Sequence, residues 1–199
     1  MPKPLLSARY RVVVRDPKGR IKYIEEAPSK SFILNLLYWW WLCFNLNGSD
    51  VISVVNTSGQ QTTQTLSQPM GWTGITGGTA PPYSGVQVGS GTSAPSASSP
   101  YLESLIVSGT GSGQLSYGTN DVTSPSLSSN PGTIQDTKTF TNNSGGTVTV
   151  GEIGLAIQAN NGITDTHMAA LIIHDVLSSA VSVSNGGTLT ITYTMEVNT

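Results

Sequence analysis

The chain has 199 residues, a length that suits one β-rich domain or a compact domain with a small appendage. Only 10% of the residues are charged, and Gly, Ser, Thr, Asn and Val dominate after residue 50, so the composition disfavours a helical protein. The single cysteine, Cys43, excludes an intrachain disulfide framework, and low charge with moderate hydropathy excludes the composition of a disordered chain.

The first 30 residues hold most of the positive charge. Eight of the nine Lys and Arg residues lie there against three acids, which makes this segment +5. The remaining residues hold Lys138 against eight acids, which makes them −7. The sequence therefore predicts a basic N-terminal segment on an acidic body. This segment has no apolar stretch of signal-peptide length, which predicts synthesis in the cytoplasm.

Residues 8–15 and 20–25 favour two strands, and Asp16-Pro17-Lys18-Gly19 between them is typical of a tight turn. We expect a β-hairpin here. Two interpretations of its charge stay open: the hairpin contacts an acidic protein surface or nucleic acid, or it has a solvated charged face. The candidate contact residues are Arg9, Arg11, Arg15 and Arg20.

An apolar run follows at residues 32–46. Its uninterrupted core, Leu36 to Phe44, has nine residues, less than half of what a membrane-spanning helix needs, so no membrane span is predicted. The run favours a short buried helix, capped by Ser29 or Ser31 and ended by Gly48.

Three consecutive tryptophans lie in this predicted helix. They would spread over roughly 200° of its circumference, so one buried face cannot cover them all. This favours a subunit interface, and the alternative is a helix sandwiched between the hairpin and the body. The candidate interface residues are Trp39, Trp40, Trp41 and Phe44.

The middle of the chain predicts two short strands, at residues 51–55 and 60–66, and then an irregular stretch over residues 68–100. That stretch is rich in Gly, Pro, Ser and Thr. A loop of this length is either functional or extended on another surface.

The C-terminal third gives the clearest strand pattern. Apolar and polar residues alternate over residues 189–197, and with Val181 and Val183 around an Asn-Gly-Gly turn they predict a β-hairpin. Residues 137–141 and 147–157 predict a second pair, with a β-bulge at Gly151 and Glu152, where the apolar phase switches.

Residues 169–176 form a continuous apolar run, which favours a strand covered on both faces. Strands of this length and spacing predict an antiparallel β-sandwich or jelly roll.

Residues that could carry chemistry are few. Asp165, His167, His174 and Asp175 include metal-ligand types, but their spacing matches no zinc site. No serine lies in a G-x-S-x-G motif, and Cys43 lies in an apolar segment that disfavours a thiolate. The carboxylates of the body are isolated in sequence. We therefore predict no catalytic, metal or cofactor site.

Three segments match patterns that recur together in one group of proteins. Residues 88–103 (VGSGTSAPSASSPYLE) are similar to a GTGTTAPSxSDTAL segment, and residues 140–155 (FTNNSGGTVTVGEIGL) to FTNxSGxxxTVxEIGL. Residues 174–194 (HDVLSSAVSVSNGGTLTITYT) are similar to RDVLxxPVTVxxGxTLTVTYT, with His174 where the pattern has Arg. This resemblance, which covers residues 86–199, is to a group of structural proteins of tailed phages and related viruses. It implies a β-sandwich and membership of a viral particle, and it assigns no catalytic residue.

These observations predict an attachment segment over residues 1–48 and a β-sandwich body over residues 49–199. The expected function is that of a non-enzymatic virion protein, in the capsid decoration, vertex or tail, made in the host cytoplasm. Its expected partners are its own copies and other virion proteins. The alternative is a carbohydrate- or receptor-binding module, in which Trp72, Tyr83 and Tyr101 would stack on a ligand.

Overall fold

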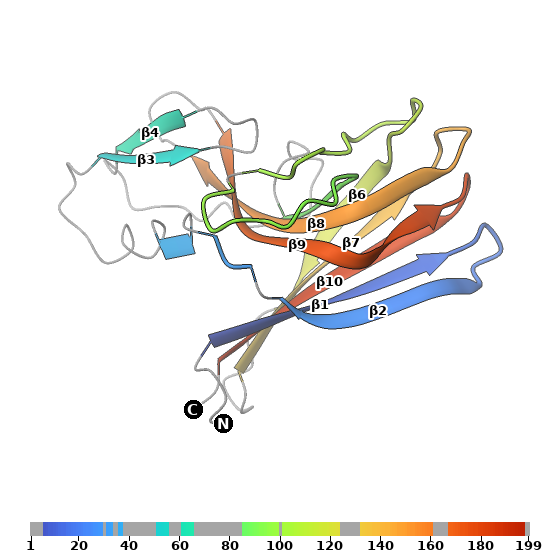
Figure 1. Ribbon diagram of the computed structural model, residues 1–199, viewed down its shortest axis with the longest axis horizontal. Coiled ribbons are helices and arrows are strands. Elements are labelled where there is room, and N and C mark those ends of the chain that lie inside the picture. The colour runs from blue at the N-terminus through green and yellow to red at the C-terminus, as the bar shows by residue number, and fades with distance from the viewer. Residues whose placement is uncertain are drawn as a thin grey trace.

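In the computed structural model, antiparallel strands dominate the described part of the chain, and none of its elements is a helix (Figure 1). The structure describes residues 6–29, 31–33, 36–37, 51–55, 61–65, 85–99, 101–123, 132–160 and 167–197, with the backbone alone at 51–55, 61–65, 158–160 and 167–170. The strands are β1 (Leu6–Arg15), β2 (Ile21–Ser29), β3 (Val51–Val55), β4 (Gln61–Thr65), β5 (Gly85–Gly89), β6 (Ser116–Val122), β7 (Gly132–Thr141), β8 (Val148–Asn160), β9 (His167–Val183) and β10 (Thr188–Val197). The mainly β class expected from the sequence is confirmed.

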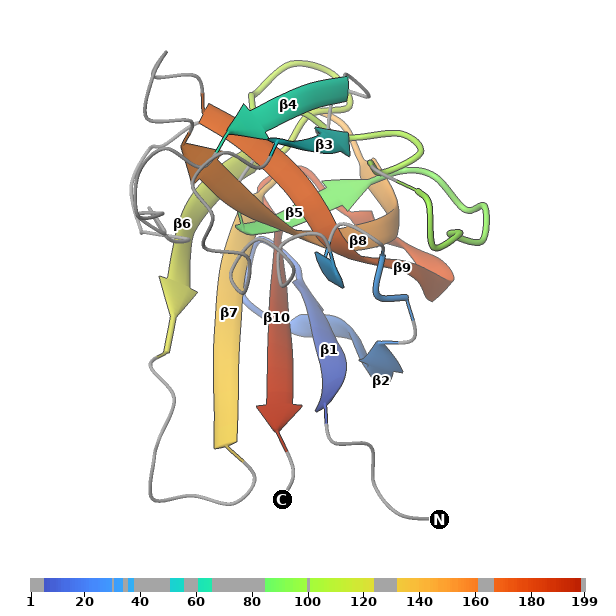
Figure 2. The ribbon, with the colours of Figure 1, turned by 90° about the vertical axis from the view of Figure 1, so that its left-hand side faces the viewer.

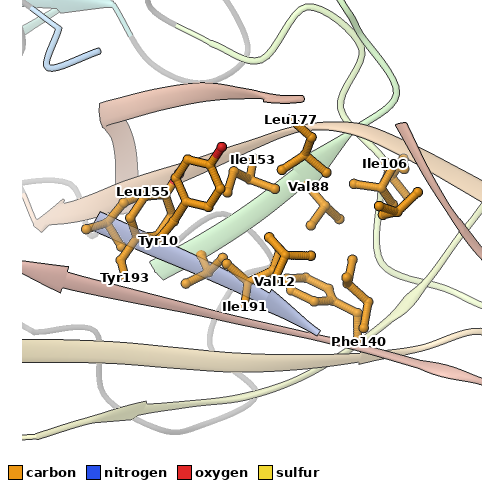
Figure 3. Close-up of a cluster of buried hydrophobic side chains, with 14 of the residues drawn as sticks. Tyr10, Val12, Val88, Ile106, Phe140, Ile153, Leu155, Leu177, Ile191 and Tyr193 are labelled. Atoms are coloured by element: carbon orange, nitrogen blue, oxygen red, sulfur yellow. The ribbon is translucent and has the colours of Figure 1, made fainter. Parts of the chain in front are cut away.

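The strands form a five-stranded sheet of order β2-β1-β10-β7-β6, a three-stranded sheet β5-β8-β9, and the pair β3-β4 that the sequence predicts. Figure 2 shows β7, β10 and β1 side by side, with β8 and β9 crossing them. One hydrophobic cluster contains side chains from both larger sheets, among them Val12, Phe140 and Ile191 from the first and Val88 and Ile153 from the second (Figure 3). The two larger sheets therefore share a core.

The predicted N-terminal hairpin is confirmed as β1 and β2. Gly19 adopts a φ of 77°, which a residue with a side chain rarely does, and its N–H donates to Asp16 O at 2.8 Å. β1 also pairs with β10, from Leu6 opposite Val197 to Arg15 opposite Thr188. The boundary that the sequence suggests at residue 48 therefore does not separate two sheets.

The two hairpins predicted in the C-terminal third are wrong in their pairing. β7 and β8 are consecutive strands, but β7 pairs with β10 and β6, whereas β8 pairs with β5 and β9. Likewise β9 belongs to the three-stranded sheet and β10 to the five-stranded one. Each turn is a corner that carries the chain from one sheet to the other.

Asn142, which is fully buried, joins the two corners. Its backbone N–H donates to Gly187 O at 2.9 Å, and its carbonyl accepts from Gly186 N at 2.7 Å. Its side-chain Nδ2 donates to Gly146 O at 2.8 Å and to Val183 O at 2.6 Å. The Asn-rich and Gly-rich segments thus bond to each other, which explains why these turns favour corners over hairpins.

Within the three-stranded sheet, two predictions are confirmed. The β8–β9 register shifts between Val150 and Glu152, as expected for a bulge. In β9, Leu171, Ile172 and Ile173 are all buried, as expected for a strand covered on both faces.

Two expected boundaries need correction. Residues 85–89 lie in the stretch predicted to be irregular, yet they form β5, because Val86 and Val88 enter the core and the strand pairs with β8. A helix does not begin at Ser31, since Phe32 instead forms a β-bridge with Ile173 at the edge of β9. The rest of the predicted helix, apart from residues 36–37, and residues 68–84 lie outside the described residues.

Candidate functional site

β1 places three of the predicted contact residues on the outer face of the five-stranded sheet. Arg9, Arg11 and Arg15 are exposed and alternate with core residues, since successive strand residues point to opposite faces. Arg20 lies after the turn, and its Nε donates to Asp16 Oδ2 at 2.7 Å. Arg9, Arg11 and Arg15 therefore lie on one face of β1. Arg20 instead forms an ion pair with Asp16 at the turn. The other predicted contact residues, Trp39, Trp40, Trp41 and Phe44, lie outside the described residues.

Arg9 and Arg11 differ in their surroundings. Arg9 Nη1 donates to Glu26 Oε1 at 2.7 Å, and its Nε donates to Glu196 Oε1 at 3.0 Å. The hydrogen bond to Glu196 raises the pKa of Arg9 above its usual value, and Glu26 adds to this effect. Arg11 makes no ion pair with the described residues. Arg9 is thus held in place, while Arg11 remains a cation that can meet a partner.

A groove of about 220 Å³ lies beside these arginines on the outer face. It is lined by Arg9, Tyr10, Arg11, Glu26, Gln135, Thr192 and Thr194. Next to it, Thr192 Oγ1 lies 2.9 Å from Thr137 Oγ1 on β7, so hydroxyl groups continue across the sheet. Guanidinium, hydroxyl and amide groups together can bind a carboxylate or another polar group.

The acidic body predicted from the sequence has fewer surface charges than the count suggests. Asp136, Glu152 and Asp175 are all buried, with exposed fractions of 1%, 0% and 5%. The sequence alone did not indicate that these acids are buried, because no pattern in the strands around them distinguishes them from exposed acids. Their carboxyl groups therefore lie in the protein interior and are not part of the surface charge.

Glu152 is the centre of a buried hydrogen-bond cluster. Its Oε1 accepts from Gly91 N at 3.1 Å and Ser104 N at 2.7 Å, and its Oε2 accepts from Glu103 N at 2.9 Å. Oε2 also lies 2.8 Å from His174 Nε2. Burial by itself raises the pKa of Glu152, but the hydrogen bonds from His174 and the two backbone amides outweigh it and hold the pKa below its usual value. The carboxylate anchors residues 91–104 to β8 and β9.

The same loop is held by a second carboxylate. Glu103 accepts from Thr92 N at 3.1 Å, Ser93 N at 3.0 Å and Ser93 Oγ at 2.8 Å, and the bonds from Ser93 are the main reason that its pKa is lowered. A Cβ atom at Gly91 would lie 2.6 Å from oxygens of both Glu103 and Glu152, so only glycine fits between them. The Gly-rich character of this segment thus has a steric cause.

The three segments of the resemblance meet at this cluster. Gly91 and Glu103 belong to the first segment, Glu152 to the second and His174 to the third. His174 occupies the position where the pattern has Arg, and it faces a carboxylate. Glu103 and Glu152 are isolated in the sequence, and the signal that could have joined them is that both lie in segments of the resemblance.

The four residues that the sequence offers as metal-ligand types do not form a metal site within the described part of the chain. His174 and Asp175 point to opposite faces of β9: His174 contacts Glu152, whereas Asp175 Oδ2 accepts from Tyr193 Oη at 3.2 Å. Asp165 and the side chain of His167 lie outside the described residues. Across the parts of the chain that are described, no group of three or more His, Cys, Asp or Glu could hold a metal ion.

A second buried polar pair lies on the inner face of β7. Asp136 and Lys138 are 1% and 5% exposed, and neither carboxylate oxygen of Asp136 has a hydrogen-bond partner among the described residues. Burial raises the pKa of Asp136 to about 7, which Lys138 only partly offsets. Burial lowers the pKa of Lys138 to about 8, and its Nζ lies 5.3 Å from the centroid of the Tyr117 ring. The sequence did not predict this buried pair, since alternation alone does not indicate polar residues in a core.

Of the aromatic residues considered for ligand stacking, Tyr101 is 43% exposed, and Trp72 and Tyr83 lie outside the described residues. Among the described residues, no helix is both long and apolar enough to cross a membrane. Comparisons of the chain with protein-family models, with curated proteins and with solved structures find no match.

Proposed function

We propose that this protein is a non-enzymatic structural subunit of a viral particle, with a β-sandwich body formed by the two larger sheets. It assembles with its own copies and with other virion proteins, in the capsid decoration, the vertex or the tail. The basic face of β1 contacts an acidic partner surface. Synthesis in the host cytoplasm and incorporation into the virion belong to the same proposal.

The observation that carries this proposal is the cluster around Glu152. The segments that resemble phage structural proteins are far apart in the chain, with Gly91 61 residues from Glu152 and Glu152 22 residues from His174, yet these three residues meet through hydrogen bonds. If the three segments resembled those proteins by chance and independently of one another, no contact between them would be expected. The likeness therefore concerns one three-dimensional unit, which supports a shared body with those proteins.

The test is assembly of the full chain and its incorporation into particles. Native mass spectrometry and electron microscopy of the purified protein measure assembly, and immunogold labelling locates it on particles from the virus that encodes it. Replacing Trp39, Trp40 and Trp41 together with Ser should leave the circular dichroism spectrum β-rich and reduce incorporation. Particles without label would overturn the proposal, and normal incorporation of the variant would exclude the Trp segment as the anchor.

The second candidate function is a carbohydrate- or receptor-binding module. It is favoured by Tyr101, which is 43% exposed and lies in the loop that Glu103 and Glu152 hold. A glycan array with the purified protein tests this function, with Tyr101→Ser as the variant. Binding that this substitution abolishes, without loss of particle incorporation, would support the module.

A further inference from the structure

One row of side chains crosses the whole outer face of the five-stranded sheet. The strand register places Glu26 opposite Arg11, Arg11 opposite Thr192, Thr192 opposite Thr137, and Thr137 opposite Asp121. Directly opposite residues on antiparallel strands lie on the same face. The hydrogen bond between Thr137 and Thr192, at 2.9 Å, marks the middle of the row.

The row carries opposite charges on its two sides. Arg11 lies one strand beyond Thr192, and Asp121 lies one strand beyond Thr137. Both are exposed, and neither forms an ion pair with a described residue. Glu26, next to Arg11, is already bound by Arg9 at 2.7 Å. Arg11 and Asp121, which form no ion pair within the described part of the chain, are therefore equally spaced about the threonine pair.

This arrangement is complementary to itself. A twofold axis that runs parallel to the strands, between two facing sheets and above the Thr137–Thr192 pair, would place Arg11 of one copy over Asp121 of the other and repeat the same contact on the other side. We propose that the outer face of the five-stranded sheet is a self-association surface, which binds a second copy through reciprocal Arg11–Asp121 contacts. The inference deepens the proposed function and rests on it, because it names the first assembly partner.

The face is large enough for such a contact. Five strands about 4.8 Å apart, with lengths of about ten residues at about 3.3 Å each, present roughly 600 Å² per copy. Two copies would bury roughly 1,200 Å² in total, the lower limit of stable interfaces. The face consists largely of threonine and charged residues, so the association is weak and weakens further as salt screens the ion pairs.

The negative charges in the row also disfavour nucleic acid as the binding partner of this face. A phosphate backbone along the row would cross the carboxylates of Glu26 and Asp121, which repel it, while only Arg11 lacks a counter-ion within the row. A second copy matches each charge with an opposite one.

Charge reversal in the full chain tests the inference. Sedimentation equilibrium over a range of concentrations, at low and high salt, measures the dimer Kd. Arg11→Glu and Asp121→Arg should each weaken the dimer at least about tenfold, since each turns two attractive contacts into two repulsive ones. The double variant Arg11→Glu/Asp121→Arg should restore it. Lys18→Glu, an equal charge change in the exposed turn, is the matched control and should leave the dimer intact.

Three outcomes overturn the inference: a wild-type protein that stays monomeric up to its solubility limit, single variants that associate normally, or a double variant that fails to recover. Circular dichroism of each variant separates loss of association from loss of folding. Fluorescence polarisation with a labelled oligonucleotide tests the rival occupant, and binding that Arg11→Glu abolishes in a monomeric protein would assign the face to nucleic acid. Immunogold labelling of particles is independent of the dimer, so failure of the inference and failure of the proposed function are distinguishable.

Discussion

Glu152→Gln is the substitution whose effect follows most directly from the geometry. The carboxylate oxygens face four donors, of which those of Gly91, Glu103 and Ser104 are backbone N–H groups that cannot reverse their polarity. A glutamine offers one acceptor oxygen and one NH₂ group. Even if His174 changes its tautomer to accept from this NH₂, the N–H of Glu103 loses its acceptor.

The expected cost is about 2–4 kcal/mol, because a backbone donor beside the fully buried Glu152 side chain loses its partner and charge-assisted hydrogen bonds are lost. With a urea m-value of about 2 kcal/mol/M, the unfolding midpoint should fall by about 1–2 M. Urea titration followed by circular dichroism measures this shift. Amide hydrogen exchange should show faster exchange at Gly91, Glu103 and Ser104 than elsewhere in the chain.

The pH dependence of the difference supplies a further check. The folded-state pKa of Glu152 lies below its ordinary value of 4.5, so the stabilisation is fully present above this pH and is lost as pH falls through the folded-state pKa. The difference in unfolding free energy between the wild type and Glu152→Gln should therefore decrease at acidic pH. Glu103→Gln, in the same loop but at an exposed carboxylate, is the control and should shift the midpoint less. An unchanged midpoint and unchanged exchange in Glu152→Gln would refute the anchoring role.

Two other substitutions probe the corners and the core. Asn142→Ala should destabilise the protein by about 1–3 kcal/mol in urea titration, because the buried carbonyl of Val183 and the carbonyl of Gly146 lose their donor. Asn143→Ala, at the exposed neighbouring position, should have little effect, and equal effects would contradict the role of Asn142. The wild type should lose stability as pH rises from about 4 to about 7, since the folded-state pKa of Asp136 is raised to about 7 from 3.8 and the proton it favours is lost across this range. Asp136→Asn should flatten that part of the pH profile in thermal unfolding, and a profile identical to that of the wild type would show that Asp136 is not the titrating group.

Local features of the fold follow from the sequence. Asp16-Pro17-Lys18-Gly19 forms the predicted turn, because proline and glycine restrict the backbone wherever they occur. The alternation over residues 189–197 correctly predicts that Leu189, Ile191 and Tyr193 enter the core, whereas Val197 at the strand end is exposed. The phase switch at Gly151 correctly predicts the bulge. Each of these signals involves residues close together in the chain.

Only the tertiary structure decided which strands pair. Period-two alternation shows that a strand has one apolar face but does not name its neighbour, and an Asn-Gly-Gly turn can close a hairpin or a corner. Here Asn142 bonds the two corners together, so consecutive strands enter different sheets. The contact of Glu152 with Gly91 and His174 has the same origin. A buried carboxylate needs hydrogen-bond donors, and the packing of the sheets decides which residues supply them, however far apart they lie in the chain.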